Sequence, residues 1–200
     1  ATVSYGLKIT EAYHIFDKTI KTYRNAVHYI SDIAIRHYDE LKSLESITGD
    51  DGKVIISAQQ RRQQKMERLI HSTANNDAAY KRFDKEFYKF PSYLRRDAIN
   101  TAIGLILSYR SQLQKWEDGG KHGRRPYLNR NQNTMPCFYR NNTFLDSEET
   151  NIVSLKLYNG KDWIWETFVI RDCDFMYAYK HMKEWKASAP VLTKRNHRYE

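Results

Sequence analysis

One apolar stripe constrains the fold of this 200-residue chain more than any other feature. Apolar residues recur there at steps of four and three, which places them on a single helix face: Leu94, Ala98, Ala102, Ile106, Tyr109 and Leu113. Pro91 suits the first turn of a helix because the N–H it lacks would have no helical partner there. Gly119 and Gly120 favour an end to the helix. The sequence therefore predicts a long helix from Pro91 to about Glu117.

Three further helical segments are predicted before this long helix. The first begins at Thr10, carries a similar stripe and runs to about Leu44, before a turn at 49–52. Ser57 is an N-cap residue type and opens a second helix that reaches about Ile70. A third helical stretch contains Tyr80, Phe83 and Phe87.

Strand patterns lie at both ends of the chain. Residues 3–9 alternate apolar and polar side chains, which is typical of a half-buried strand. Residues 152–157 and 163–170 flank the turn Asn159–Gly160 and predict a hairpin. Shorter strands are predicted at 137–140 and 191–193, and a helix at 174–187. These patterns predict an α+β fold, in which about four helices are inserted between a first strand and a β-rich part with one added helix.

The motifs of several enzyme classes are missing from the sequence. Gly-x-Ser-x-Gly, a P-loop, His-Glu-x-x-His and a Gly-x-Gly-x-x-Gly turn are all absent. Acidic pairs such as Asp50–Asp51 and Asp172/Asp174 lie at turns and element ends, where carboxylates act as caps. Cys137 and Cys173 are not spaced as metal ligands. We therefore expect no catalytic residue, no metal and no cofactor in this chain.

Charge and aromatic content favour a polyanionic partner. The formal net charge is +9, the calculated isoelectric point is about 9.4, and aromatic residues make up 14% of the chain. Such a balance is typical of proteins that bind nucleic acid or an anionic membrane. The start has no charged region followed by an apolar one, and no apolar run is long enough to cross a bilayer. We expect a cytoplasmic protein that does not associate with a membrane and has no small-molecule substrate.

Three basic clusters are candidate contacts to a phosphate backbone. The strongest is a Gly- and Pro-containing loop, whose candidate residues are Lys121, His122, Arg124, Arg125, Tyr127 and Arg130. The second follows the last predicted strand and comprises Lys194, Arg195, His197 and Arg198. A weaker candidate is a row on the second helix: Arg61, Arg62, Lys65 and Arg68. The alternative for the loop is a solvated linker, and for the row a solvated helix face.

Several of these segments resemble a known family. The run at 90–99 (FPSYLRRDAI), the helix after it, the Gly123–Pro126 loop and the ending at 188–199 (SAPVLTKRNHRY) are similar to the N-terminal half of OrfB/TnpB-type transposon proteins. These proteins are RNA-guided DNA endonucleases of insertion sequences and relatives of the type V CRISPR effectors. The resemblance covers nearly the whole chain in order, although 49–76 and 146–150 match no motif of the family.

The resemblance implies a domain organisation and a partner. Residues 1–9 would be the first strand of a wedge domain, 10–120 a helical recognition lobe, and 121–200 a basic linker and an OB-like sheet or barrel. The implied partners are guide RNA and target DNA, in the context of transposition and DNA recombination. The RuvC-like nuclease domain would follow Glu200, so the fragment itself would not be an enzyme. Two alternatives are a stand-alone DNA-binding regulator of the same descent and a protein-interaction module.

Overall fold

The computed structural model describes residues 6–9, 14–129, 134–146, 150–182, 184, 188–195 and 198–200. Backbone proximity divides the chain into two compact units. The β unit comprises residues 1–23, 89–94 and 135–200, and the helical unit comprises residues 24–88 and 95–134. Helices and antiparallel strands are both present, so the fold class is α+β, as the sequence predicts.

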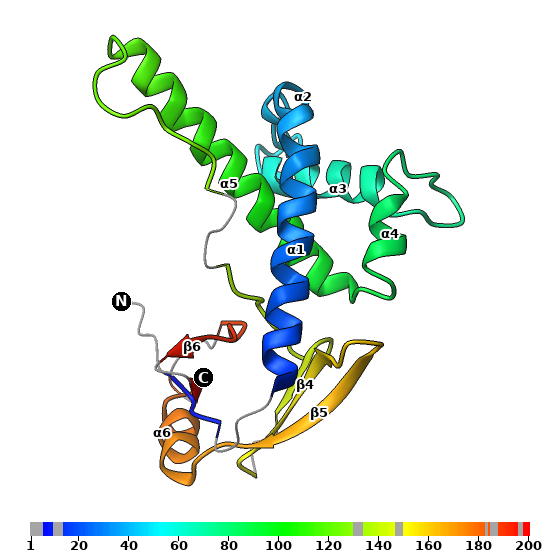
Figure 1. Cartoon of the computed structure of the whole chain (residues 1–200), viewed down its shortest axis with the longest axis vertical. Coiled ribbons are helices and arrows are strands. Elements are labelled where there is room, and N and C mark those ends of the chain that lie inside the picture. The colour runs from blue at the N-terminus through cyan, green and yellow to red at the C-terminus, as the bar shows by residue number, and fades with distance from the viewer. Residues whose placement is uncertain are drawn as a thin grey trace. The chain divides into compact units, whose positions relative to one another are not determined.

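Six helices lie within the described residues (Figure 1), and their bounds are α1 His14–Arg36, α2 Tyr38–Lys42, α3 Ala58–Ile70, α4 Arg82–Glu86, α5 Ser92–Asp118 and α6 Asp172–Met182. The long helix predicted from the apolar stripe is α5. Five of the six stripe residues are buried, and Tyr109 is partly exposed. Ser57 caps α3 as predicted, since its Oγ accepts from Gln60 N at 3.2 Å and the Gln60 side chain accepts from Ser57 N at 2.9 Å.

The first helix departs from its predicted length because the chain breaks helical geometry at His37. This residue has φ −103° and ψ 18°, and it separates α1 from the short α2. Its imidazole contacts Glu40 Oε2 at 3.1 Å through Nδ1 and the Tyr80 hydroxyl at 3.0 Å through Nε2. The side chain thus bonds to a neighbouring turn and to a distant loop at the point where the two helices meet.

The turn at 49–52 lies in a small hairpin that the sequence patterns did not indicate. Strand β1 (Ile47–Thr48) pairs antiparallel with β2 (Val54–Ile56), and Gly52 supplies the positive φ of the turn, +73°. Both strands are short and lie largely at the surface, so the alternation that predicts longer strands is absent. Strands of two and three residues are too short for a sequence pattern to indicate them.

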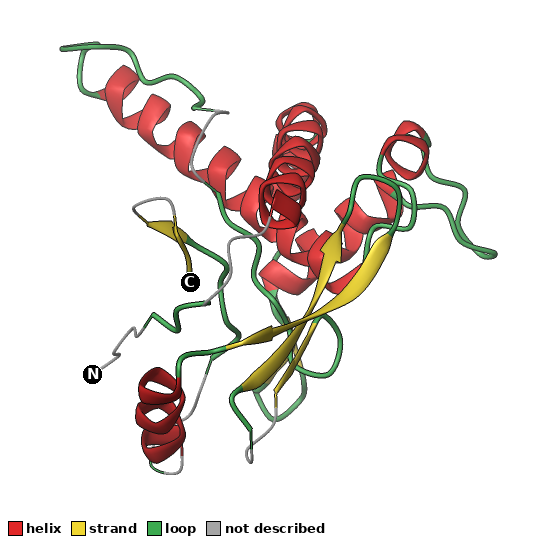
Figure 2. Ribbon diagram, turned by 60° about the horizontal axis from the view of Figure 1, so that its bottom comes forward, coloured by secondary structure: helices red, strands yellow, loops and turns green. Residues whose placement is uncertain are grey.

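The β unit contains a three-stranded antiparallel sheet in the order β3-β4-β5 (Figure 2). Its strands are β3 Phe144–Asp146, β4 Ile152–Tyr158 and β5 Trp163–Val169, and the predicted hairpin around Asn159–Gly160 joins β4 to β5. One face carries buried side chains that pack with Phe16 and Ile20 from the first half of α1. Phe16 contacts the rings of Phe168 and Tyr199 at centroid distances of 4.9 and 4.6 Å.

Other parts of the β unit are joined by single bridges. Ile9 bridges Ile170, while residues 3–5 of the predicted first strand lie outside the described residues. The predicted strands at 137–140 and 191–193 meet through one bridge, Cys137 to Val191. Strands β6 (Lys194–Arg195) and β7 (Arg198–Tyr199) form a terminal hairpin. Helix α6 ends at Met182, earlier than predicted, and residues 183 and 185–187 lie outside the described part.

The helical unit is held together by contacts between its helices. The Tyr29 ring on α1 lies 5.9 and 6.1 Å from the rings of Phe83 and Phe87 at α4. The Arg110 guanidinium on α5 lies over the ring of Tyr38 on α2, 4.5 Å from its centroid. Apart from these contacts, α1 and α5 each bury a continuous stripe of aliphatic side chains. None of the helices in the described part has the length and apolar character needed to cross a bilayer.

Candidate nucleic-acid interface

The basic loop begins where α5 ends, and three residues with positive φ turn the chain back along the helix. These residues are Gly120 (+78°), Lys121 (+62°) and Gly123 (+75°). Lys121 N donates to Trp116 O at 2.8 Å, and the Trp116 indole N–H donates to Gly123 O at 3.3 Å. The loop is therefore folded against the last turn of α5 (Figure 1), with a defined conformation.

Two aromatic rings support the arginines of this loop. The Arg124 guanidinium lies 5.4 Å from the centroid of the Tyr127 ring, and the Arg125 guanidinium lies 6.0 Å from a ring centroid of Trp116. Both distances are within the range of cation–π attraction. A stacked guanidinium keeps its N–H donors at its edge free for an anion.

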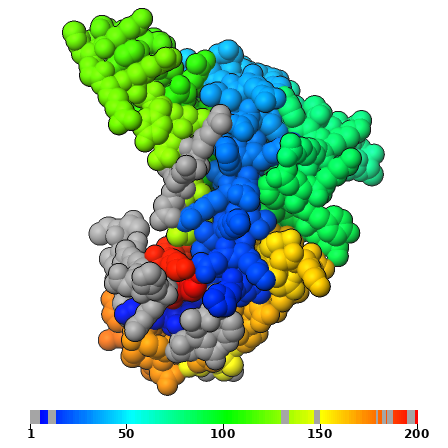
Figure 3. Space-filling view, in the orientation of Figure 1, coloured from blue at the N-terminus to red at the C-terminus, as the bar shows by residue number. Residues whose placement is uncertain are grey.

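The cationic side chains of the loop are exposed to solvent. Lys121, His122, Arg124 and Arg125 are all exposed, and 65% of Tyr127 is accessible. Within the described ranges none of these four basic residues forms a salt bridge, although Glu117 and Asp118 precede them at the helix end. In the space-filling view this end of α5 and its loop form an open, projecting part of the helical unit (Figure 3). The arrangement can present positive charge to an extended polyanion.

An uncharged hollow lies beside the loop. Its volume is about 230 Å³, and its lining consists of Leu105, Ser108, Tyr109, Gln112, Tyr127, Leu128 and Asn129. Two tyrosines and three polar side chains can offer both a stacking face and hydrogen-bond groups. Such a surface next to exposed guanidinium groups suits a nucleotide, which has a flat base beside a charged phosphate.

Two residues of this interface were not singled out from the sequence. Trp116 fixes the loop and supports Arg125, and Tyr109 lines the hollow while also belonging to the helix stripe. The signal for Trp116 was its place in the last helical turn before the basic loop. Tyr109 gave no separate signal, because an aromatic residue at helical spacing indicates core. Arg130, predicted with the loop, lies outside the described residues.

In the terminal hairpin, Lys194 is the one predicted contact whose side chain the structure describes. Its Nζ lies 2.8 Å from Asp17 Oδ1 on α1 and 5.0 Å from the centroid of the Tyr199 ring. Arg195 and Arg198 pair across the hairpin through their backbones, and their side chains are outside the described part, as is all of His197. Lys194 thus has a structural contact in addition to any role at a phosphate.

Most of the helix row is engaged within the protein. Arg61 Nη1 donates to Glu45 O at 2.7 Å, and Arg62 donates to Leu41 O at 2.8 Å and Leu44 O at 3.3 Å. Lys65 forms a salt bridge with Glu40. These cations satisfy carbonyl groups and a carboxylate at the end of α2, which has no helical donors for its last carbonyls. Arg68 is exposed and has no side-chain partner among the described residues.

No group of three or more His, Cys, Asp or Glu side chains in the described part of the chain could hold a metal ion. Within the described ranges, neither Cys137 nor Cys173 forms a disulfide. The basic loop and the hollow beside it are therefore the best candidate interface of the helical unit.

These features define an α+β protein with a cationic, aromatic-supported loop at the end of its longest helix. The chain belongs to the Aq_aa04 family, whose model matches residues 1–159. The matched part includes α1 to α5, the basic loop and the strands through β4. No curated protein and no solved structure matches the chain.

Proposed function

We propose that this chain binds nucleic acid, and that the loop around Arg124 and Arg125 is its main phosphate contact. The observation that carries the proposal is the support of both guanidinium groups by aromatic rings, at 5.4 and 6.0 Å, with no salt-bridge partner within the described residues. An arginine kept at the surface without a carboxylate retains donors that match phosphate oxygens. The net charge of +9 favours the same class of partner.

The resemblance to OrfB/TnpB-type proteins makes the proposal more specific. In this more specific proposal, the chain is the non-catalytic N-terminal region of a TnpB-like RNA-guided DNA endonuclease. The β unit acts as an OB-like wedge that holds guide RNA, and the helical unit covers the guide–target duplex. Such proteins recognise the duplex by its backbone and shape, while base pairing reads the sequence. Cleavage is assigned to a RuvC-like domain of the full-length parent.

Salt-dependent binding tests the proposal directly. Filter binding of a structured RNA and of duplex DNA is measured at several salt concentrations, for the unchanged chain and for Arg124→Ala/Arg125→Ala. Each phosphate contact contributes about one unit to the slope of log affinity against log salt. The double variant is expected to bind more weakly and to have a slope smaller by about two units.

A matched control separates local contacts from net charge. Lys21→Ala/Lys85→Ala removes two exposed cations that do not belong to the loop, and it is expected to change the slope by less than the loop variant. Equal slopes for both double variants would remove the loop from the interface. Absence of binding to RNA and DNA at low salt would refute the nucleic-acid function itself.

A further inference from the structure

A second charged hollow lies in the helical unit, at the end of α3. Its volume is about 610 Å³, and it is lined by Glu67, Arg68, His71, Thr73, Asn75, Asn76, Arg95 and Arg96. Three arginines against one glutamate give this lining a formal excess of two positive charges. None of these residues belongs to the basic loop or to the hollow beside it, so the charge here needs its own explanation.

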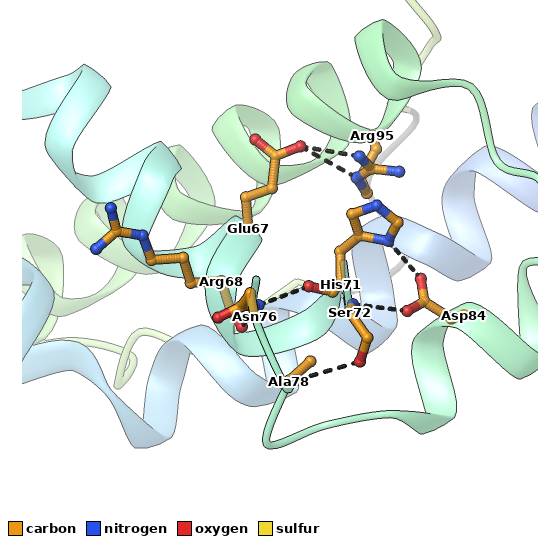
Figure 4. A network of polar contacts seen from close by, with 8 residues as sticks. All are labelled: Glu67, Arg68, His71, Ser72, Asn76, Ala78, Asp84 and Arg95. Atoms are coloured by element: carbon orange, nitrogen blue, oxygen red, sulfur yellow. Dashed lines mark hydrogen bonds and ion pairs between the residues drawn. The ribbon is translucent and has the colours of Figure 1, made fainter. Parts of the chain in front are cut away.

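Among the described residues of the lining, Glu67 is the only carboxylate, and it is already bound by arginines. Glu67 Oε1 accepts from Arg95 Nε at 3.3 Å and from Arg95 Nη2 at 2.9 Å (Figure 4). Glu67 Oε2 lies 3.5 Å from Arg96 Nε. Arg95 is only 8% exposed, so its charge requires this partner. The carboxylate of Glu67 thus contacts the guanidinium groups of Arg95 and Arg96 and holds both side chains in the lining of the hollow.

A closed turn forms the rim. Thr73 and Asn76 exchange backbone hydrogen bonds of 2.9 and 3.2 Å, and the Asn76 side chain donates to Arg68 O at 2.9 Å and His71 O at 2.8 Å. The amide of Asn76 therefore caps the last carbonyls of α3 and fixes the turn to the helix (Figure 4). Thr73 and Asn75 are left exposed at the rim, where a hydroxyl and an amide can donate to a ligand.

His71 is oriented by an acidic residue outside the lining. Its Nδ1 lies 2.8 Å from Asp84 Oδ1, and Asp84 Oδ2 accepts from Ser72 N at 2.9 Å. The contact fixes the plane of the imidazole and, when the ring is protonated, balances its charge. Because Nδ1 faces Asp84, Nε2 is the ring nitrogen that a ligand in the hollow could meet.

We propose that this hollow binds a phosphate group, with Arg68 and Arg96 as its charged donors. Arg68 has no side-chain partner within the described residues, and 46% of the Arg96 side chain is accessible, so both can turn toward an anion. A guanidinium matches two phosphate oxygens at once, and the neutral donors of the rim can complete the set. This site is separate from the basic loop and does not depend on the role proposed for it.

A titration of the whole chain with inorganic phosphate, followed by backbone amide NMR, tests the site. Sodium chloride keeps the ionic strength constant, and saturable shifts are expected at residues 73–76 and 95–96. Arg68→Ala/Arg96→Ala should weaken the binding by about tenfold or more. Lys85→Ala removes one exposed charge from α4 and should leave the binding unchanged.

Additional variants keep the result interpretable. Arg68→Gln alone leaves the Glu67–Arg95 pair in place, so a weaker response in this variant cannot be attributed to a loss of folding. Shifts that do not saturate, or that persist in Arg68→Ala/Arg96→Ala, overturn the proposal. Phosphate shifts that remain in Arg124→Ala/Arg125→Ala would support this site even if the basic loop proves not to bind nucleic acid.

The source of the phosphate is decided by competition. A single-stranded oligonucleotide without terminal phosphates is added to the phosphate-bound chain. Displacement of phosphate from residues 73–76 identifies a backbone phosphodiester as the ligand. Retention of phosphate identifies a free or terminal phosphate, and a 5′-mononucleotide that shifts the same amides supports that source.

Discussion

The ammonium group of Lys194 lies 2.8 Å from Asp17 Oδ1, which connects the terminal hairpin to the first half of α1. The same ammonium lies over the Tyr199 ring, and Tyr199 packs against Phe16 in the core of the β unit. A residue predicted from its basic neighbourhood therefore stabilises the fold. The Asp17–Lys194 pair also makes the stability of the fold depend on pH, and the direction of this dependence follows from the pKa of Asp17.

We predict that Asp17→Asn lowers stability at neutral pH and reduces the loss of stability in acid. The Lys194 ammonium, which donates to the Asp17 carboxylate, and then the nearby Tyr199 side chain hold the pKa of Asp17 below the ordinary value of 3.8. This contribution is present above that value and is lost as the pH falls through the lowered pKa. The hydrogen bond to Asp17 is also the main cause that raises the pKa of Lys194 above its ordinary value of 10.5, so the lysine keeps its charge throughout this pH range.

Urea unfolding at neutral and at acidic pH measures both effects. Asp39→Asn is the control, because Asp39 is an exposed carboxylate in the first turn of α2. An acid response of Asp17→Asn equal to that of the unchanged chain would show that the pair is not formed in solution.

A second prediction concerns the ion pair of Glu67 with the buried Arg95. Glu67→Gln removes the carboxylate that accepts from Arg95, a residue that is 8% exposed, and should cost about 3 kcal/mol. Glu86→Gln removes a surface pair with Arg82 and should cost less than about 1 kcal/mol. The free energy of unfolding of both variants is measured in urea. Equal costs would contradict the role of Glu67 in fixing Arg95.

A third prediction separates stability from binding in the helix row. Arg62→Ala removes hydrogen bonds to Leu41 O and Leu44 O and should lower the free energy of unfolding by about 1 to 2 kcal/mol. Gln64→Ala, on an exposed part of the same helix, should have little effect. A strong loss of nucleic-acid affinity in Arg62→Ala without any loss of stability would instead assign this arginine to the interface.

A fourth prediction concerns the backbone of the basic loop. Lys121 has φ +62°, a conformation that glycine adopts without strain, so Lys121→Gly should be more stable than Lys121→Ala by about 1 kcal/mol. Gly123→Ala should lower the stability by a similar amount, because alanine is strained at φ +75°. The added Cβ would meet no atom within 4 Å, so no steric clash adds to this cost. Thermal unfolding of the three variants provides the comparison. A Gly123→Ala variant as stable as the unchanged chain would show that the loop conformation is not fixed.

Local patterns predicted the longer elements, and long-range contacts decided the remainder. The stripe of α5, the Ser57 cap and the Asn159–Gly160 hairpin are each encoded within a few neighbouring residues. At the break between α1 and α2, His37 bonds to Tyr80, which is 43 positions away, and no local pattern contains this contact. The hairpin of β1 and β2 has strands of two and three residues, which are too short to show alternation.

The candidate site divides in the same way. The exposure of Arg124 and Arg125 is consistent with a short loop in which glycine and proline interrupt a run of cations. The roles of Arg61 and Arg62 could not be predicted, because the carbonyls they bind become neighbours only when α2 and α3 pack together. A row of cations on one helix face looks the same in sequence whether it faces a polyanion or the end of another helix.

The division of the chain into two units has a consequence for the order of folding during synthesis. All residues of the helical unit have been made once residue 134 has been added, so this unit can fold while the ribosome is still working. The β unit combines residues 1–23 and 89–94 with residues 135–200. Phe16 and Ile20 must therefore wait for Leu192 and Tyr199 before their core is complete. Until then these apolar side chains on α1 lack native partners, and a nascent chain is most open to chaperone binding at that stage.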